Sequence, residues 1–165
     1  MIRSTFVSLV AFGAVSPLIA DDPKPSMKRA EARAALEKKF EDALTNASME
    51  GFFTVDGMKA DKPPIKDVYK IDSCKKSGGD VWIITAFIGH SNVKLPVPVE
   101  VRWAGDTAVI MLTDVGLPGI NGKFSTRLLI DGHRYAGTWS HDKVGGHMWG
   151  VLGKTPAESK DKSAK

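Results

Sequence analysis

The segment VKLPVPVEVRW, residues 93–103, restricts the fold of this chain more than any other part of the sequence. Apolar side chains occupy every odd position from Val93 to Trp103, and lysine, proline, glutamate and arginine occupy the even positions. Because successive side chains of a strand point to opposite faces, this alternation predicts a β-strand with one wholly apolar face. Such a face must be covered by another apolar layer of the same fold.

The same two-residue period continues through the chain from Ser48 onward, in short runs separated by turn residues about every ten positions. This spacing predicts a mainly β fold: an antiparallel up-and-down meander of about eight strands that forms a small barrel, either open or closed. We expect the strands near residues 48–56, 66–74, 80–89, 93–103, 107–113, 123–130, 133–141 and 146–153.

Two prolines mark one edge of the 93–103 strand. Pro96 and Pro98 lack backbone N–H groups, and groups two residues apart point toward the same neighbouring strand. We therefore expect the sheet to be open or bulged beside residues 96–98. This edge is either protected or a surface where a partner docks, and Pro96 and Pro98 are the candidate interaction residues.

An amphipathic helix is predicted before the first strand, over residues 27–46, with Ser26 as its N-cap. Apolar side chains fall on one stripe at helical spacing. These are Ala32, Leu36, Phe40, Ala43, Leu44 and Ala47. The layout is then a signal peptide at 1–20, a leader and helix at 21–47, a β domain at 48–153 and a disordered basic tail at 154–165.

The first twenty residues have the layout of a secretory signal peptide. Arg3 precedes the apolar run of residues 5–20, which stops at Asp21, and Ala20 is the expected cleavage site. The run is short for a membrane span, so we expect an exported protein, periplasmic or extracellular, with no span after cleavage. The single cysteine, Cys74, cannot form an internal disulfide and is expected to be buried.

Turn residues give the expected pairing of the last three strands. Asp131-Gly132 is a two-residue turn signal. It pairs Ile130 with His133, Leu128 with Tyr135 and Phe124 with Trp139, all on the apolar face.

The final hairpin lies within GTWSHDKVGGHMWG, residues 137–150. A three-residue turn at 143–145 would place His141 opposite His147 and Trp139 opposite Trp149. A four-residue loop would instead pair His141 with Gly146 and Trp139 with Met148. The sequence leaves both registers open.

Candidate binding residues follow from this meander. The aromatic side chains of the apolar faces would line a ligand pocket if the barrel is hollow, and would fill its core if it is solid. They are Phe87, Trp103, Phe124, Tyr135, Trp139 and Trp149. His90, His141 and His147 would lie near one rim, where imidazoles can bind zinc or copper, although no tight ligand spacing supports such a site.

WAGDT at 103–107 and the YAGTWSH and GGHMWG elements of 135–150 resemble a group of small secreted bacterial β-proteins that have no assigned activity. The architecture is also similar to lipocalin and avidin barrels. In lipocalins the GxW motif belongs to the first strand, whereas here Gly137 and Trp139 lie near the end of the chain. This resemblance implies a fold and no reaction.

These features favour an exported binding module for a small apolar ligand. The alternative is a structural or inhibitory protein of the cell envelope that binds another protein, and a histidine-based metalloprotein or enzyme is a third hypothesis. No catalytic motif or cofactor-binding motif is present, and we expect no cofactor. The net charge of +4 comes without an aromatic and basic stripe, so nucleic acid is not an expected partner.

Overall fold

The computed structural model describes residues 23–59, 61–87 and 94–155 of the chain. One helix, α1 (Pro23–Leu44), precedes eight strands. The strands are β1 (Ala47–Phe53), β2 (Ile65–Gly78), β3 (Val81–Phe87), β4 (Lys94–Ala104), β5 (Thr107–Leu117), β6 (Ile120–Asp131), β7 (Arg134–His141) and β8 (Val144–Lys154).

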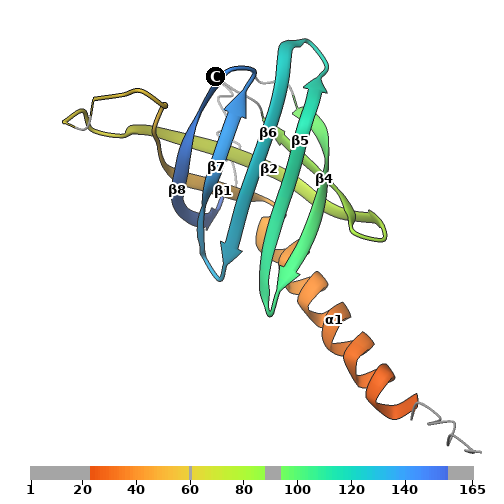
Figure 1. The fold of residues 1–165 in the computed structure, drawn as a ribbon. Helices are drawn as coiled ribbons and strands as arrows, with labels where there is room; N and C mark the ends of the chain where they lie inside the picture. Colours follow the sequence, from red (N-terminus) through yellow and green to blue (C-terminus); the bar gives the residue numbers. More distant parts are fainter. Residues whose placement is uncertain (1–22, 60, 88–93, 156–165) are drawn as a thin grey trace, which may run out of the picture.

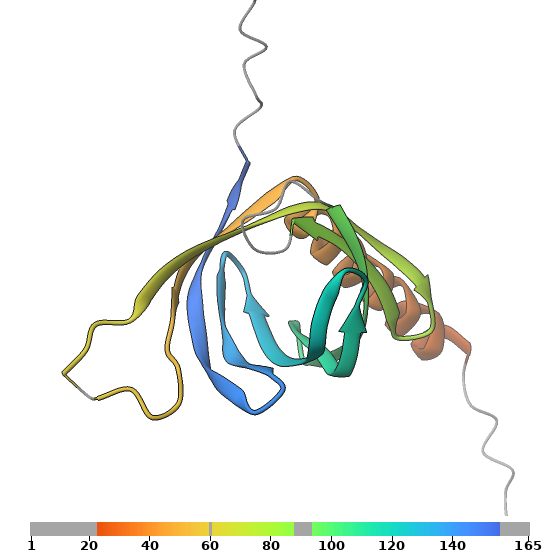
Figure 2. The same cartoon turned by 90° about the horizontal axis from the view of Figure 1, so that it is seen from above.

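The strands form a closed antiparallel barrel in which each pairs with the next and β8 pairs with β1 (Figures 1 and 2). The predicted fold class is confirmed, and of the open and closed forms the barrel takes the closed one. Buried apolar side chains of β1 to β7 and the partly buried Met148 and Leu152 of β8 point inward, because the two-residue period keeps each apolar set on one face. The connection from β1 to β2 projects away from the barrel wall (Figure 2).

Helix α1 begins four residues earlier than predicted, at Pro23, where a proline needs no N–H partner. Ser26 therefore lies inside the helix and is not its N-cap. The helix ends at Leu44, and Asn46 takes a φ of 52°, the left-handed conformation that terminates many helices. The chain then enters β1 directly at Ala47.

The C-terminal half of α1 packs against one end of the barrel, which we call the helix end (Figure 1). Phe40 contacts the rings of Trp82 and Trp103 edge-on, with ring centroids 5.1 and 5.8 Å away. Leu44 is completely buried. Lys154, the last residue of β8, donates from its Nζ to the main-chain carbonyls of residues 42, 43 and 45, which satisfies acceptors that a helix leaves unpaired.

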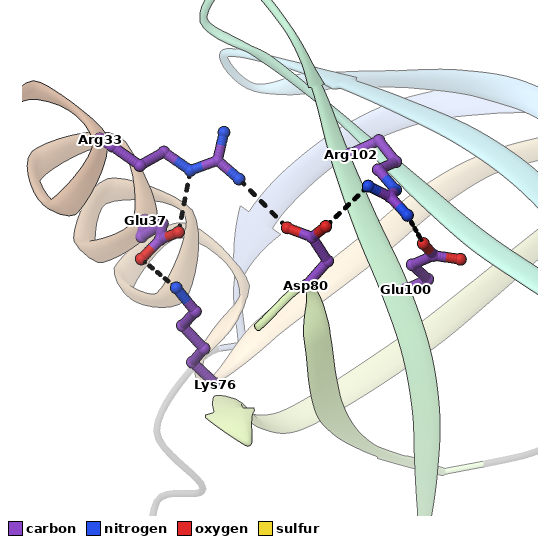
Figure 3. Close-up of polar contacts among 6 residues, drawn as sticks. All are labelled: Arg33, Glu37, Lys76, Asp80, Glu100 and Arg102. Carbon is purple, nitrogen blue, oxygen red and sulfur yellow. Dashed lines mark hydrogen bonds and ion pairs between the residues drawn. The ribbon is translucent and has the colours of Figure 1, made fainter. Parts of the chain in front are cut away.

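A chain of ion pairs ties α1 to the β2–β3 and β4 strands (Figure 3). Glu37 accepts from Arg33 on its own helix at 2.9 Å and from Lys76 of β2 at 2.7 Å. Arg33 also reaches Asp80, which pairs with Arg102 of β4. Burial raises the pKa of Glu37, but the hydrogen bonds from Lys76 and Arg33 outweigh it, so the pKa lies below its ordinary value.

Cys74 is completely buried on β2, as predicted. Burial raises the pKa of its thiol to about 12, and the nearby carboxylate of Glu41 adds to the rise. The thiol is therefore protonated and unreactive in the folded chain.

The β6–β7 hairpin has a different register from the predicted one. Its turn is Gly132-His133, with Gly132 at a φ of 60°, so Asp131 pairs with Arg134. Ile130 then pairs with Tyr135, and Phe124 with His141. The pairing differs from the predicted one by two residues, so the predicted pairs are wrong although the strand residues keep their predicted faces.

Both predicted registers of the β7–β8 hairpin are wrong. The turn is Asp142-Lys143, and Trp139 pairs with Gly146. Asp142 takes the left-handed φ of 53°, a conformation that aspartate tolerates, and exchanges two hydrogen bonds with the main chain of Lys123. Gly146 lies within β8 and not in the turn. A glycine is needed there because a Cβ would lie 1.9 Å from the carbonyl oxygen of Thr54.

The expected gap beside the two prolines is present. β3 pairs with β4 along residues 94–100, whereas the β4–β5 ladder covers only residues 100–104 of β4. Val101 donates its N–H to Asp80 on the β3 side, so N–H groups at even positions point toward β5. Pro96 and Pro98 have no N–H group to donate to β5, and the β4–β5 ladder stops at Glu100.

Candidate functional site

The interior of the barrel differs between its two ends. At the helix end most inward side chains are buried, including Trp82, Val101 and Ile130, and Trp103 is partly buried. At the other end, which we call the open end, most inward side chains are only partly buried. These are Phe53, Asp67, Tyr69, Leu95, Val115, Phe124, Trp139, His141 and Met148. The open end therefore presents a ring of partly exposed, mostly aromatic side chains to solvent.

Two aromatic pairs lie in this ring. Trp139 of β7 contacts Phe53 of β1 edge-on, with ring centroids 5.7 Å apart. Phe124 of β6 stacks on the imidazole of His141 at 4.2 Å, and these two residues are direct partners in the β6–β7 register. The indole N–H of Trp139 donates to the carbonyl of Thr54 at 3.2 Å, so the ring has a fixed orientation. These pairs form a rigid apolar surface suited to a small apolar ligand.

A polar cluster lies deeper on the same inner wall. Asp67 of β2 pairs with Gly51 and so shares its inward face, and Tyr69 follows two residues later on that face. Tyr135 reaches the cluster from β7 because Gly51 and Gly150 leave room for its ring. A Cβ at Gly51 would lie 2.5 Å from the Tyr135 hydroxyl, and one at Gly150 would lie 2.8 Å from it.

Burial and the charge of Asp67 together raise the pKa of both phenols above the ordinary value of a tyrosine. The pKa of Tyr69 is raised by burial and then by its hydrogen bond to Asp67. Burial raises the pKa of Tyr135 to about 12, and the negative charge of Asp67 contributes to the rise. The carboxylate of Asp67 also accepts from the N–H of Val68 at 2.8 Å. The cluster therefore offers one carboxylate and two hydroxyls to a polar group of a ligand.

Two of the six residues predicted to line a pocket, Phe124 and Trp139, face the interior at the open end. Tyr135 also faces inward, but it is buried nearer the helix end, beside its partner Ile130. Trp103 faces inward at the helix end, where it packs on Phe40 and lies under the guanidinium of Arg33 at 4.8 Å. Ligand contact by any of these residues stays a prediction.

The other two predicted pocket residues point outward, so their assignment to the interior is wrong. The inward residues of β3 are the buried Trp82, Ile84 and Ala86, so Phe87 lies on the opposite face of the strand. The ammonium of Lys94 lies 5.5 Å from the centre of its ring. Trp149 faces outward because the β7–β8 turn has two residues, and 37% of its surface is exposed.

The three histidines proposed as metal ligands are not shown to converge. His90 lies outside the described residues. His141 faces inward and its Nε2 lies 2.7 Å from the carbonyl oxygen of Asn121, whereas His147 points to the outer face of β8. Among the residues that the structure describes, no group of three metal-ligating side chains is close enough to hold an ion.

Asp67, Tyr69 and Phe53 were missed in the sequence-based prediction of site residues. The segment IKDVYKI, residues 65–71, carries the signal: Ile65, Tyr69 and Ile71 alternate on the inward face, and Asp67 interrupts this apolar series. A carboxylate among inward-facing apolar side chains needs hydrogen-bond partners. Tyr69 and the main-chain N–H of Val68 supply them.

A second candidate surface lies at the β4–β5 gap. A hollow of about 330 Å³ opens there, lined by residues of both strands. Pro98, Val99, Met111, Thr113 and Val115 are among them. Arg127 of β6 donates to the carbonyl of Leu112 at 2.7 Å and so steadies the β5 side of the gap.

Comparisons of the chain with protein-family models, with curated proteins and with solved structures find no match. Within the described residues, no helix has the length and apolar content needed to cross a membrane. The functional assignment therefore depends on the geometry of the barrel.

Proposed function

We propose that this chain is an exported binding module that holds a small apolar or amphipathic ligand at the open end of the barrel. The single observation that carries this proposal is the contrast in burial along the interior. The inward rings of Phe53, Phe124 and Trp139 are partly exposed at the open end. At the helix end Trp82 is buried, and the partly exposed ring of Trp103 packs on Phe40 of α1. Partly exposed rings in the mouth of a barrel are a common form of small-molecule site.

The ligand would lie against the Phe53–Trp139 and Phe124–His141 pairs, which remove its apolar part from water. Asp67 and Tyr69, deeper in the wall, would accept or donate hydrogen bonds to its polar end. The fixed orientation of Trp139 lowers the entropy lost on binding. Export is proposed from Arg3 and the apolar run of residues 5–20.

Titration with an apolar fluorescent probe tests this function, and the β7–β8 hairpin supplies a matched pair of variants. Trp139→Ala removes a ring at the open end, and Trp149→Ala removes one from the outer face. We expect saturable binding with one probe per chain, weakened about tenfold by Trp139→Ala because one aromatic contact contributes about 1.4 kcal/mol.

In the same titration, Trp149→Ala is expected to bind the probe as the unaltered chain does. Absence of saturable binding contradicts the proposed function. Binding that is lost only in Trp149→Ala would place the probe on the outer wall and would contradict the proposed site.

The β4–β5 gap favours a second candidate function, the docking of a protein partner in the cell envelope. The unpaired edge beside Pro96 and Pro98 and the adjoining hollow support it. Pull-down from envelope extract with the unaltered chain and with the double variant Pro96→Val, Pro98→Val tests it. A partner that binds this edge is lost or weakened in the double variant, and an unchanged set of captured proteins contradicts the hypothesis.

A further inference from the structure

Asp67 brings a carboxylate to the inner face of the barrel wall. It lies on β2 between Ile65 and Tyr69, in the phase of that strand whose neighbouring members are apolar or aromatic. Asp67 is partly buried, so water still reaches it. Taking a charge even partly out of water is unfavourable unless an opposite charge or hydrogen-bond donors lie against it. The groups around Asp67 therefore decide what this part of the interior can bind.

The described groups that contact this carboxylate are neutral. Asp67 accepts hydrogen bonds from the N–H of Val68, at 2.8 Å, and from the hydroxyl of Tyr69. None of the ion pairs formed within the described ranges includes Asp67. A carboxylate has about four acceptor positions, and these two donors leave others free. Asp67 can therefore accept further hydrogen bonds, and a cationic donor would supply the opposite charge as well.

Aromatic side chains adjoin Asp67 on the inner wall. Tyr69 lies beside it, and the hydroxyl of Tyr135 lies in the space left by Gly51, which is the partner of Asp67 in the β1–β2 ladder. Phe53 follows two residues after Gly51 on β1, about 7 Å nearer the open end. The face of an aromatic ring attracts a cation, and the attraction is stronger where water is excluded. The rings and the carboxylate thus favour the same sign of charge in a ligand.

Lysine and arginine are missing from the inward side chains that the structure describes at the open end. His141 is the basic residue among them, and it stacks on Phe124 while its Nε2 lies 2.7 Å from the carbonyl oxygen of Asn121. The chain as a whole has the opposite balance, with a net charge of +4. Attraction of a cation into the barrel would therefore come from the interior and not from the overall charge.

We propose that the ligand of the open end is an amphipathic amine, whose ammonium group binds Asp67 and whose apolar chain lies along the Phe53–Trp139 pair. This inference rests on the proposed binding function and names the chemical class of its ligand. The ammonium donates hydrogen bonds to the free acceptor positions of Asp67 and lies against the ring of Tyr69. Its chain runs about 7 Å to the level of Phe53 and continues to the rim. A fatty acid is disfavoured, since two like charges would share a partly buried site.

Calorimetric titration with three ligands of the same chain length, decylamine, decanol and decanoate, tests the proposal. Decylamine is protonated at neutral pH and is expected to bind about tenfold more tightly than decanol, because charge-assisted hydrogen bonds replace neutral ones. Decanoate should bind more weakly than decanol. Adsorption driven by the net charge of +4 would give the reverse order, with decanoate the tightest.

Asp67→Asn and Asp131→Asn are matched variants that each remove one negative charge. Asp131 lies at the helix end in an exposed ion pair with Arg134. Asp67→Asn should weaken decylamine binding about tenfold, to the level of decanol, and leave decanol binding unchanged. Asp131→Asn should bind all three ligands as the unaltered chain does. A thermal unfolding midpoint near that of the unaltered chain shows that each variant is folded, and if Asp67→Asn is not, the order of the three ligands on the unaltered chain decides.

Four results overturn the amine proposal: equal binding of decylamine and decanol, tightest binding of decanoate, an amine preference that survives in Asp67→Asn, or a preference lost equally in both variants. In each of them decanol and the apolar fluorescent probe still bind, so the binding function at the open end stands. Absence of binding by the probe and by all three ligands overturns the amine proposal and the proposed function together.

Discussion

At the helix end of the barrel, Phe40 and Leu44 of α1 cover the inward side chains of the strands, and only about 40 Å³ of space remains beside them. At the open end, Phe53 and Trp139 pack on each other, and no helix of the described chain covers them. The two ends are formed by the same strands, and among the described residues α1 covers one end and not the other. The comparison teaches that aromatic rings inside a barrel are part of the core where a helix packs on them and are candidate binding residues where they stay partly exposed.

The largest expected effect compares the same substitution at the two ends. Phe40→Ala is expected to lower the free energy of unfolding by about 3–5 kcal/mol, because the lost ring leaves a cavity against two tryptophans. Phe53→Ala should lower it by about 1 kcal/mol or less, since its ring is partly exposed. Urea unfolding measures both, and equal losses would show that the open end is packed as core.

A smaller effect is expected from the contact between β8 and the end of α1. Lys154→Met keeps much of the apolar stem but removes the ammonium that binds three main-chain carbonyls at the end of α1, with an expected loss of about 1–2 kcal/mol. Lys143→Met, in the turn at the open end, is the matched control and should change stability little. Urea unfolding distinguishes them, and a neutral Lys154→Met would mean that water replaces the ammonium without loss.

Glu37, at the helix end, should make the stability of the chain depend on pH. The pKa of Glu37 is lower in the folded chain than its ordinary value of 4.5, so its contribution is complete above that pH and is lost as the pH falls through the folded pKa. At neutral pH, Glu37→Gln should be less stable by under about 1 kcal/mol, as expected for partly exposed ion pairs. Unfolding measured from neutral to acid pH checks this, and a difference that does not shrink below about pH 4.5 contradicts it.

The smallest expected effect comes from a substitution that leaves stability unchanged or raises it. The indole nitrogen of Trp103 is buried and, in the described part of the chain, has no hydrogen-bond partner. Trp103→Phe keeps a ring against Phe40 and under Arg33 while removing this donor, so stability should be unchanged or raised by up to about 1 kcal/mol. A thermal unfolding scan measures this change, and a loss of more than about 2 kcal/mol would show that packing of the larger ring dominates.

The period of the apolar residues was enough to predict the strands, most of their faces and the helix that precedes them. The gap beside Pro96 and Pro98 was also predictable, because a proline always lacks its N–H group. The registers of the last two hairpins could not be predicted from the sequence. The last turn depends on the hydrogen bonds of Asp142 to Lys123 on another strand, and without that contact a turn ending at Gly145 looked equally good. That error of register placed Trp149 inside the barrel.

The polar cluster at Asp67 shows a different limit of sequence analysis. Its tyrosines come from strands far apart in the sequence, and they meet only because two glycines on the strands between them leave space. A contact between residues 67 and 135 depends on barrel closure, which the strand pattern left undecided. The residues of the candidate site were therefore harder to predict than the wall that carries them.

The most direct test of the account is collisional quenching of tryptophan fluorescence by acrylamide in two folded variants. One keeps only Trp82 at the helix end and the other only Trp139 at the open end, with the remaining tryptophans replaced by phenylalanine. The account predicts that Trp139 is quenched several-fold faster than Trp82 and that a bound apolar probe protects it. Equal quenching of the two rings, or no protection by the probe, would contradict the claim that the open end is an accessible binding surface.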